Sequence, residues 1–549
     1  MTSEGERSSA PTADGFPAGP ATRTEQVGGR PPPAAAAEPE HLEPAPRPPS
    51  ARLVPLATFL AGLAVGAAVR AWLLGDRAAL TWNDTADFLT ISHASWISPA
   101  LWAGARAPGV PVVLKLLGAD GDRYVDVQAG LAAVCWAALG ASVATAVTGR
   151  WWRAAAVVLV LAFSVTTPVT MWERSILSES PGVSSLALVV AAGLQLARGV
   201  TWRRAAMLAA ALVPWSAVRD THLVVAVLGG LAALAAVAAS LLVERRRRST
   251  ERGAARDRNG GERARGGDGA PASPNGGGAG AGRDEAVGAA HAATARRRRP
   301  WRRPLAALGA TAIVLGLLVA VGSAHGERQA FPTRNIYAVR VLPYPDRVRW
   351  FADHGMPQAG EFLGPDRRVP YQEPGLPPVV SVGDDDPELG EWLAWVRGDG
   401  RATFALFVAT HPGFLFSEPI RVPERTFNNA RGDREFYAAV DRPELPLVDS
   451  LLARRTAEVL LVAGLALGWA IGRRRWSPAL VAGLVTALLA LPHGAVAWHS
   501  DGMETARHLV VPAIQFHLGV LLMVVGMFPA ARGPTGEHVG VDGVRSPHG

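Results

Sequence analysis

Repeated apolar runs of about 20 residues constrain this sequence more than any other feature. The first extends from Leu53 to Leu74, and later runs alternate with polar stretches rich in Pro, Gly and Arg. A helix of about 20 apolar residues is long enough to cross the hydrocarbon core of a bilayer, which is about 30 Å thick. The sequence therefore predicts an all-α polytopic membrane protein with about ten transmembrane helices.

The apolar runs place the expected spans and leave one loop that is only partly polar. That loop, residues 75–122, follows the first span. It carries apolar residues in 91–102 and 108–117, which predict short amphipathic helices lying in the membrane interface. The spans themselves are expected at 53–74, 125–147, 154–171, 183–196, 205–218, 223–243, 305–321, 457–471, 478–496 and 509–528.

Polar segments divide the chain into membrane and non-membrane parts. Residues 1–50 hold almost no large apolar groups and are expected to form a disordered cytoplasmic tail. Residues 244–303 begin and end in Arg runs and are expected to form a disordered basic cytoplasmic linker. Residues 324–450 are numerous enough for a small extracytoplasmic domain, α/β or irregular. The remaining parts are a six-span module (51–243), a single span (304–323), the C-terminal spans (451–530) and a cytoplasmic tail (531–549).

The net charge of +8 lies mostly in Arg runs beside apolar spans. Such runs usually determine topology, so we expect membrane lipids and no nucleic acid among the partners. With the N-terminus inside, the dense Arg clusters fall on the cytoplasmic side. The loops that carry Asp, Glu and His fall on the opposite side, together with 324–450. The sequence thus predicts a multi-pass cell-membrane protein with both termini in the cytoplasm and any active site outside.

Asp84 and Asp87 follow the first span directly. In a helix, residues three apart share a face, so both carboxylates would point the same way. Acidic side chains near hydrocarbon are costly, and their presence there is by default a sign of function. The alternative is that they only cap an interfacial helix, since Asp is a favoured N-cap residue.

Further charged residues are expected on the same side of the membrane. A carboxylate can act as a general base on a hydroxyl group, and Arg or His can hold a phosphate. This combination suits a lipid-phosphate-linked sugar, because nucleotide sugars are not available outside. Each of these charged residues also has an alternative structural role. Glu179 would stabilise a helix N-terminus by its negative charge, and Arg219 and Arg507 would anchor their helices at the membrane interface. A divalent cation held by Asp and Glu would also bind the phosphate, although no spacing of metal ligands in the sequence requires one. The residues concerned are Glu179, Arg219, His222 and Arg507.

Four stretches resemble the GT-C superfamily, the membrane glycosyltransferases that use polyprenyl-phosphate sugars. This superfamily includes the protein O-mannosyltransferases and the aminoarabinose transferases of lipid A. Asn83–Leu89 resembles the Asp-containing first loop, and Gly104–Pro111 resembles an Arg-Pro-Pro-Gly-Tyr-Pro stretch. Ile176–Ser180 resembles a Ser/Thr-Glu at a span start, and Arg507–Pro512 an Arg-Tyr-x-x-Pro span entry. The resemblance covers residues 53–243 well and the C-terminal spans loosely.

The resemblance implies transfer of a sugar from a polyprenyl-phosphate donor to an envelope acceptor, which is a glycan, a protein or a lipid. An acceptor hydroxyl would displace the lipid phosphate in one step, which inverts the anomeric centre. Asp84 is the first candidate for the base and Asp87 the second. The family usually has an Asp-Glu pair or a lone Asp, so this spacing leaves the base open. The same resemblance makes Arg219, His222 and Arg507 phosphate contacts, with Glu179 beside them.

Two other classes of function fit the pattern. A lipid or sugar-lipid transporter or flippase would place polar groups in the middle of its spans and often shows internal repeats. The sequence instead places its charges at span ends. A non-catalytic cell-envelope protein that presents the 324–450 segment would not need Asp84. Replacement of Asp84 therefore separates the enzyme from the scaffold.

Overall fold

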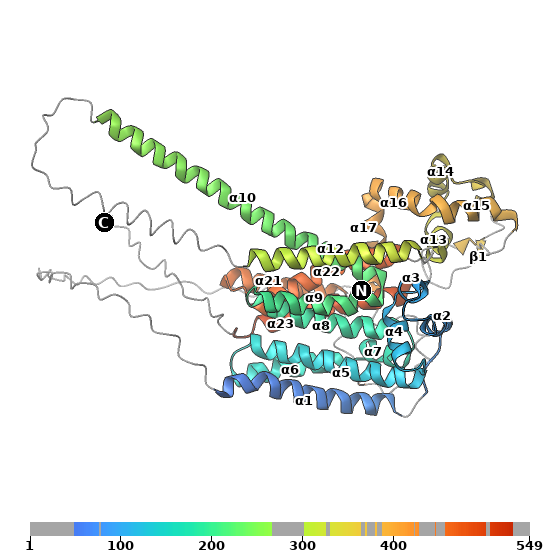
Figure 1. Cartoon of the computed structure of the whole chain (residues 1–549), viewed down its shortest axis with the longest axis horizontal. Coiled ribbons are helices and arrows are strands. Elements are labelled where there is room, and N and C mark those ends of the chain that lie inside the picture. The colour runs from blue at the N-terminus through green and yellow to red at the C-terminus, as the bar shows by residue number, and fades with distance from the viewer. Residues whose placement is uncertain are drawn as a thin grey trace, which may run out of the picture. The chain divides into compact units, whose positions relative to one another are not determined.

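The computed structural model describes most of the membrane-embedded chain (Figure 1). The chain forms two units, Met1–Pro49 and Ser50–Gly549, and the membrane helices belong to the second. The expected N-terminal tail (to residue 48), the C-terminal tail and much of the basic linker lie outside the described residues. These are 49–75, 78–265, 301–325, 330–363, 368–369, 379–380, 387–421, 423–427, 445, 456–500 and 505–530.

Long apolar helices dominate the described part of the chain. Eight of them are long and apolar enough to cross a membrane. The protein is therefore a helical, multi-pass membrane protein, as the apolar runs predict. The eight helices are α1 (Pro49–Leu74), α5 (Gly121–Ala146), α8 (Glu179–Ala197), α10 (Asp220–Arg265), α12 (Arg302–His325), α21 (Thr456–Arg473), α22 (Pro478–Ser500) and α23 (Thr505–Gly526).

The two other expected spans are helical but less regular. The run at 154–171 is broken into α6 (Arg150–Ser164), α7 (Thr167–Thr170) and η1 (Met171–Arg174), with a bend of 57°. Pro168 stands at the start of α7, where its missing N–H favours a new helix over continuation of the old one. The run at 205–218 forms α9 (Trp202–Val218), which has only 17 residues. Each of the ten predicted runs therefore contains helix, and the number that cross the membrane stays a prediction.

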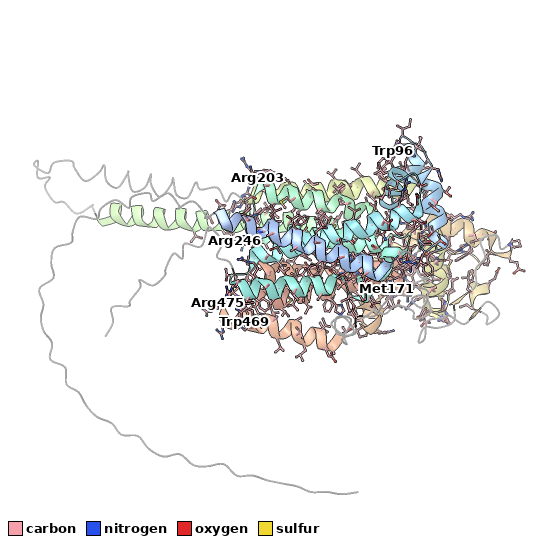
Figure 2. The ribbon with its side chains drawn as sticks, turned by 90° about the horizontal axis from the view of Figure 1, so that it is seen from below. Trp96, Met171, Arg203, Arg246, Trp469 and Arg475 are labelled. Carbon is pink, nitrogen blue, oxygen red and sulfur yellow. The ribbon has the colours of Figure 1, made fainter. Side chains whose placement is uncertain are left out.

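The basic linker begins later than the composition predicts. Disorder is expected from residue 244, but α10 continues without a break to Arg265 (Figure 1). Residues 244–265 are rich in Arg, Ala and Glu, which are good helix formers, so the helix of the sixth span extends beyond its apolar part. Figure 2 labels Arg203, Arg246 and Arg475 at one end of the long helices and Trp96 toward the other end.

The first loop folds into the expected short helices, α2 (Asn83–Ser92), α3 (Pro99–Ala103) and α4 (Gly109–Leu116). The chain just before α2 pairs with the chain after η1. The Leu80 N–H donates to the Arg174 carbonyl at 2.8 Å, and the Ile176 N–H donates back to the Leu80 carbonyl at 3.2 Å. The hydroxyl of Thr85 also donates to the Ile176 carbonyl. These bonds fix the start of α2 beside the chain that leads into α8.

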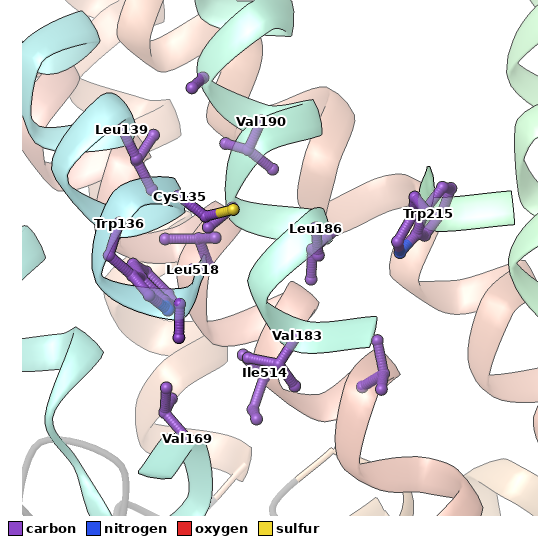
Figure 3. Packing of buried hydrophobic residues seen from close by; sticks show 14 of the residues in the cluster. Cys135, Trp136, Leu139, Val169, Val183, Leu186, Val190, Trp215, Ile514 and Leu518 are labelled. Carbon is purple, nitrogen blue, oxygen red and sulfur yellow. The ribbon is translucent and has the colours of Figure 1, made fainter. Parts of the chain in front are cut away.

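The core of the membrane part lies between α5, α8 and α23. Figure 3 shows Trp136 of α5, Leu186 of α8, and Ile514 and Leu518 of α23 among the side chains of one buried cluster. Helices α22 and α23 approach closely at glycines, since a Cβ built on Gly483 would lie 2.5 Å from a carbonyl oxygen of α23. Small residues at such contacts let helix backbones pack tightly in membranes.

A buried ion pair joins α1 to η1 and corrects one expectation. From its place near the outer end of the first span, Arg70 is expected to snorkel to the membrane interface, and Glu173 is expected to be a solvated or Arg174-paired turn residue. Both side chains are instead buried, with Arg70 Nε donating to Glu173 Oε1 at 2.9 Å. Arg70 Nη2 also donates to the Ser164 carbonyl at 2.9 Å. The two charged side chains pair with each other inside the protein. This pairing offsets the free-energy cost of removing both charges from water.

The 324–450 segment, for which the sequence predicts an α/β or irregular domain, is mainly helical where the structure describes it. Aromatic side chains build its core, with Tyr337, Phe351 and Trp392 fully buried. Its two strands, β1 (Arg368–Val369) and β2 (Val379–Val380), form one short antiparallel pair. Its helices are α13 (Ala330–Ile336), η2 (Tyr337–Val341), α14 (Pro345–Asp353), η3 (Ala359–Phe362), η4 (Pro387–Leu389), α15 (Gly390–Trp395), η5 (Val396–Gly400), α16 (Arg401–Thr410), α17 (Pro412–Arg421) and α18 (Pro423–Thr426).

Candidate functional site

A polar pocket of about 140 Å³ lies where the first loop meets the ends of α8, α9, α10, α22 and α23. Segments that are far apart in the sequence supply its walls. Three of the six predicted site residues line it, Asp84, Arg219 and Arg507, and Glu179 is paired with two of these. The complete lining is Asp84, Phe88, Ala105, Arg106, Ala107, Ser178, Val218, Arg219, Asp220, Thr221, Pro332, Ser500, Arg507 and His508.

Asp84 lies in the first turn of α2 and is held by two arginines. Its Oδ1 accepts from Arg106 Nη2 at 2.7 Å, and its Oδ2 accepts from Arg507 Nη2 at 2.5 Å. Burial disfavours the charged carboxylate, but the positive charges of Arg507 and Arg106 outweigh this and hold the pKa of Asp84 below its usual range. The side chain is 17% exposed, so a small molecule in the pocket can reach it.

Asp87 shares the face of Asp84, as their spacing predicts. Both carboxylates contact the same guanidinium, because Arg106 Nη2 lies 2.8 Å from Asp87 Oδ2. Asp87 is 50% exposed and does not line the pocket. Its contact with the pocket therefore runs through Arg106, whereas Asp84 faces the pocket itself.

Glu179 begins α8 and is completely buried. Its Oε1 accepts from Arg219 Nη2 at 2.8 Å and lies 3.1 Å from Arg507 Nε. One carboxylate thus holds an arginine from the α9–α10 junction and one from the first turn of α23. Glu179 lies behind the two arginines rather than in the lining, so it positions them and does not meet a ligand directly.

Two pocket residues were missed in the sequence. The Pro and Gly residues around Arg106 suggest a turn, yet Arg106 bridges Asp84 and Asp87. His508 is one of several histidines scattered along the chain, yet its Nδ1 lies 2.8 Å from Arg219 Nη2. The resemblance offered a signal for Arg106, since it lies in one of the four stretches. Each of those stretches contributes at least one charged residue to the set of ion pairs at the pocket, namely Asp84, Arg106, Glu179 and Arg507.

His222 is the predicted site residue that does not join the pocket lining. Its ring is fully buried and stacks on Trp215, with centroids 4.9 Å apart and planes within 7°. Its Nδ1 lies 2.9 Å from the Trp215 carbonyl, and the His493 ring meets it edge to face at 5.3 Å. On its other side it packs against Gly182, where an added Cβ would lie 2.8 Å from the ring. His222 therefore supports the packing of α8 against α10 beneath the pocket.

An apolar cavity of about 380 Å³ adjoins the polar pocket, and Val218 lines both. The cavity lies between α4, α5, α8 and α9. Its walls are almost entirely hydrocarbon, so an acyl or isoprenoid chain suits it and a polar group does not. The lining is Trp102, Pro108, Gly109, Val110, Val112, Val113, Tyr124, Gln128, Leu131, Cys135, Pro181, Ser184, Ser185, Leu188, Pro214, Ala217 and Val218.

The described residues contain no cluster of three or more His, Cys, Asp or Glu side chains arranged to hold a metal ion. The carboxylates near the pocket instead face guanidinium groups. Comparison with known proteins gives no match to any family model, curated protein or solved structure. The chemistry of the site must therefore be argued from its geometry.

Proposed function

We propose that this protein is an integral membrane glycosyltransferase, which moves a sugar from a polyprenyl-phosphate donor to an acceptor outside the cytoplasm. The observation that carries the proposal is one juxtaposition. A pocket lined by two carboxylates and three arginines shares Val218 with a cavity lined by hydrocarbon. A lipid-phosphate sugar needs both surfaces next to each other, one for its charged head and one for its chain.

The arginines suit the phosphate. Guanidinium groups bind phosphate oxygens with two parallel donors, and here Arg106, Arg219 and Arg507 all face one pocket. Their charge would also stabilise the lipid phosphate as it leaves, since preorganised cations aimed at developing negative charge lower a barrier most effectively. Glu179 holds two of these arginines in place before any ligand arrives.

Asp84 suits the general base because it lies in the lining and carries an ionised carboxylate. Both of its oxygens are occupied by arginine donors in the structure, which makes it a weak proton acceptor. A donor phosphate that draws Arg106 and Arg507 toward itself would release one oxygen of Asp84. The acceptor hydroxyl then loses its proton to Asp84 while its oxygen attacks the anomeric carbon, and the bond to the phosphate breaks. Such a single displacement inverts the anomeric centre.

The test is sugar transfer by Asp84→Asn in membranes that contain a radiolabelled polyprenyl-phosphate sugar and endogenous acceptor. Loss of a general base typically lowers a rate by about 10² to 10⁴-fold, so we expect activity to fall to background. Asp87→Asn is the companion variant: it removes the second carboxylate on Arg106 but leaves the pocket lining intact, so we expect a smaller loss of activity. Full activity in both variants would reject the mechanism.

A sugar-lipid transporter is the second candidate, and a different observation favours it. His222 and His493 lie buried within the helices and in contact with each other. Ionisable side chains inside a membrane protein often line a transport path. The test is movement of a labelled polyprenyl-phosphate sugar across the membrane of vesicles that contain the reconstituted protein. Movement by both wild type and Asp84→Asn would favour the transporter over the enzyme.

A further inference from the structure

The exposed surface of α17 (Pro412–Arg421) is apolar up to its last residue. Phe416 is 53% exposed and Ile420 is 62% exposed, and a spacing of four residues puts them on one side of the helix. We call these two residues the apolar face of α17. Single exposed apolar side chains are common, so the surroundings of this face must decide whether it meets water or lipid. The exposed residues of the helix are Pro412, Gly413, Phe416, Ile420 and Arg421.

The opposite side of α17 is bound to the last turn of the membrane helix α22. The Leu415 carbonyl lies 3.1 Å from Nε2 of His499, and the indole N–H of Trp498 donates to Glu418 Oε2 at 3.3 Å. Phe416 and Ile420 each stand two residues from Glu418, and two helical residues turn by about 200°. The apolar face therefore points away from α22, at the level where that helix ends.

The chain that follows α17 packs against two further membrane helices. The hydroxyl of Thr456, where α21 begins, donates to the Pro423 carbonyl at 3.2 Å. The ring of Phe427 lies 5.2 Å from that of Phe516, which is nine residues beyond the start of the α23 span at Arg507. At about 1.5 Å per residue, Phe427 reaches about 14 Å along that span. The chain after α17 thus enters the membrane part, which places α17 at its edge.

The helices that hold this chain have lipid-facing surfaces of their own. Leu461 and Leu465 of α21 are 64% and 63% exposed, and Leu488 of α22 is 53% exposed. Because these helices are long and apolar enough to cross a bilayer, such side chains meet lipid. The exposed Arg421 at the end of α17 combines a long apolar stem with a charged tip, which suits the headgroup region.

We infer that α17 is a membrane-binding helix, which lies in the interface and inserts Phe416 and Ile420 among the lipid chains of one leaflet. Amphipathic helices bind membranes in this way, with the apolar side in the acyl region and charges among the headgroups. Ser500 at the end of α22 lines the polar pocket, so this leaflet is the one at the pocket end. The 324–450 segment is then held on the bilayer as well as on the membrane helices. The inference applies equally to an enzyme, a transporter or a scaffold, so it does not depend on the proposed function.

The test measures what surrounds each side chain when the full chain is in nanodiscs of phosphatidylcholine and phosphatidylglycerol. Cys135 is the single cysteine, so Cys135→Ala gives a background in which one introduced cysteine carries a nitroxide spin label. Electron paramagnetic resonance then compares relaxation of the label by oxygen, which concentrates in lipid, and by a water-soluble nickel chelate. For Phe416→Cys and Ile420→Cys we expect oxygen to relax the label more strongly than nickel does.

Two controls fix the scale of this measurement. Leu461→Cys, on the exposed side of α21, gives the ratio of oxygen to nickel relaxation in lipid. Asp346→Cys gives the ratio in water, because this side chain is 95% exposed and lies on the aromatic-cored part of the 324–450 segment. Ratios at 416 and 420 on the lipid side of the Asp346→Cys value support the inference. Ratios equal to that value would place the face in water and overturn it. Protection from both reagents would mean that protein, such as a second copy of the chain, covers the face, and this would overturn it too.

Discussion

Glu179 gives the sharpest test of how the pocket is built. The carboxylate is completely buried, accepts from Arg219 at 2.8 Å and lies 3.1 Å from Nε of Arg507. Glu179→Gln keeps the size of the side chain but removes the charge that both guanidiniums face. The two arginine side chains are only 13% and 8% exposed, so water replaces the lost carboxylate charge only in part.

The magnitude follows from the negative charge lost at the two contacts, with Arg219 and Arg507. A hydrogen bond to a charged group contributes about 1.5 to 3 kcal/mol, and breaking a buried ion pair from one side typically costs about 3 to 5 kcal/mol. Arg507 keeps its ion pair with Asp84 in this variant, so the free-energy cost lies at the lower end of that range. We therefore expect Glu179→Gln to lower the free energy of unfolding by about 3 kcal/mol.

Unfolding in detergent, followed by tryptophan fluorescence, measures this effect. The matched control is Asp346→Asn, which also removes a carboxylate from an arginine pair, but on the surface. Exposed pairs contribute little, so the control should unfold like wild type. If Glu179→Gln has the same free energy of unfolding as the control, the Glu179 carboxylate does not stabilise the packing of these helices. Its role in positioning Arg219 and Arg507 is then wrong.

Three further predictions concern the pocket, the adjoining cavity and the helix packing. The lowered pKa of Asp84 means that its carboxylate stabilises the fold above its ordinary pKa of 3.8. That contribution is lost as pH falls through the lowered value, so the stability difference between wild type and Asp84→Asn should shrink on acidification, and a constant difference would contradict this. Val113→Phe should raise the KM for a long-chain donor by about tenfold and spare a short-chain donor. Leu116→Phe, on the exposed face of the same helix, should change neither KM. Gly483→Ala should cost about 1 to 3 kcal/mol in an unfolding assay, because its Cβ would strike the backbone of α23. Gly464→Ala has open space around it and should not destabilise the protein.

The apolar runs predicted where helices form, because a segment in hydrocarbon must satisfy its own backbone hydrogen bonds. They did not predict where helices end. Pro168 breaks one run, and the good helix formers after residue 244 extend another. The buried pair of Arg70 and Glu173 was also missed, since a partner 103 residues away leaves no local signal.

The sequence predicted that Asp84, Glu179, Arg219 and Arg507 lie close together. Placing the N-terminus and the Arg clusters in the cytoplasm puts all four residues on the opposite side of the membrane. The contacts made by each side chain were not predicted. His222 shows why. Successive helical residues turn by about 100°, so Asp220 and His222 point in nearly opposite directions. Asp220 lines the pocket, and His222 therefore packs against α8 beneath it.

The structure separates Asp84 and Asp87, which the sequence ranked as first and second candidates for the base without deciding between them. Asp84 and Asp87 share one guanidinium, but of the two only Asp84 lines the pocket and pairs with Arg507 as well. Under the proposed function a base must reach the proton that it removes, and the place of Asp84 in the lining favours it over Asp87. Asp87 can instead hold Arg106 when the Asp84 oxygen is given up, so that the arginine stays at the pocket. Under the proposed function the pair works as one unit, in which the more exposed Asp87 keeps Arg106 in place and the partly buried Asp84 is released to accept a proton.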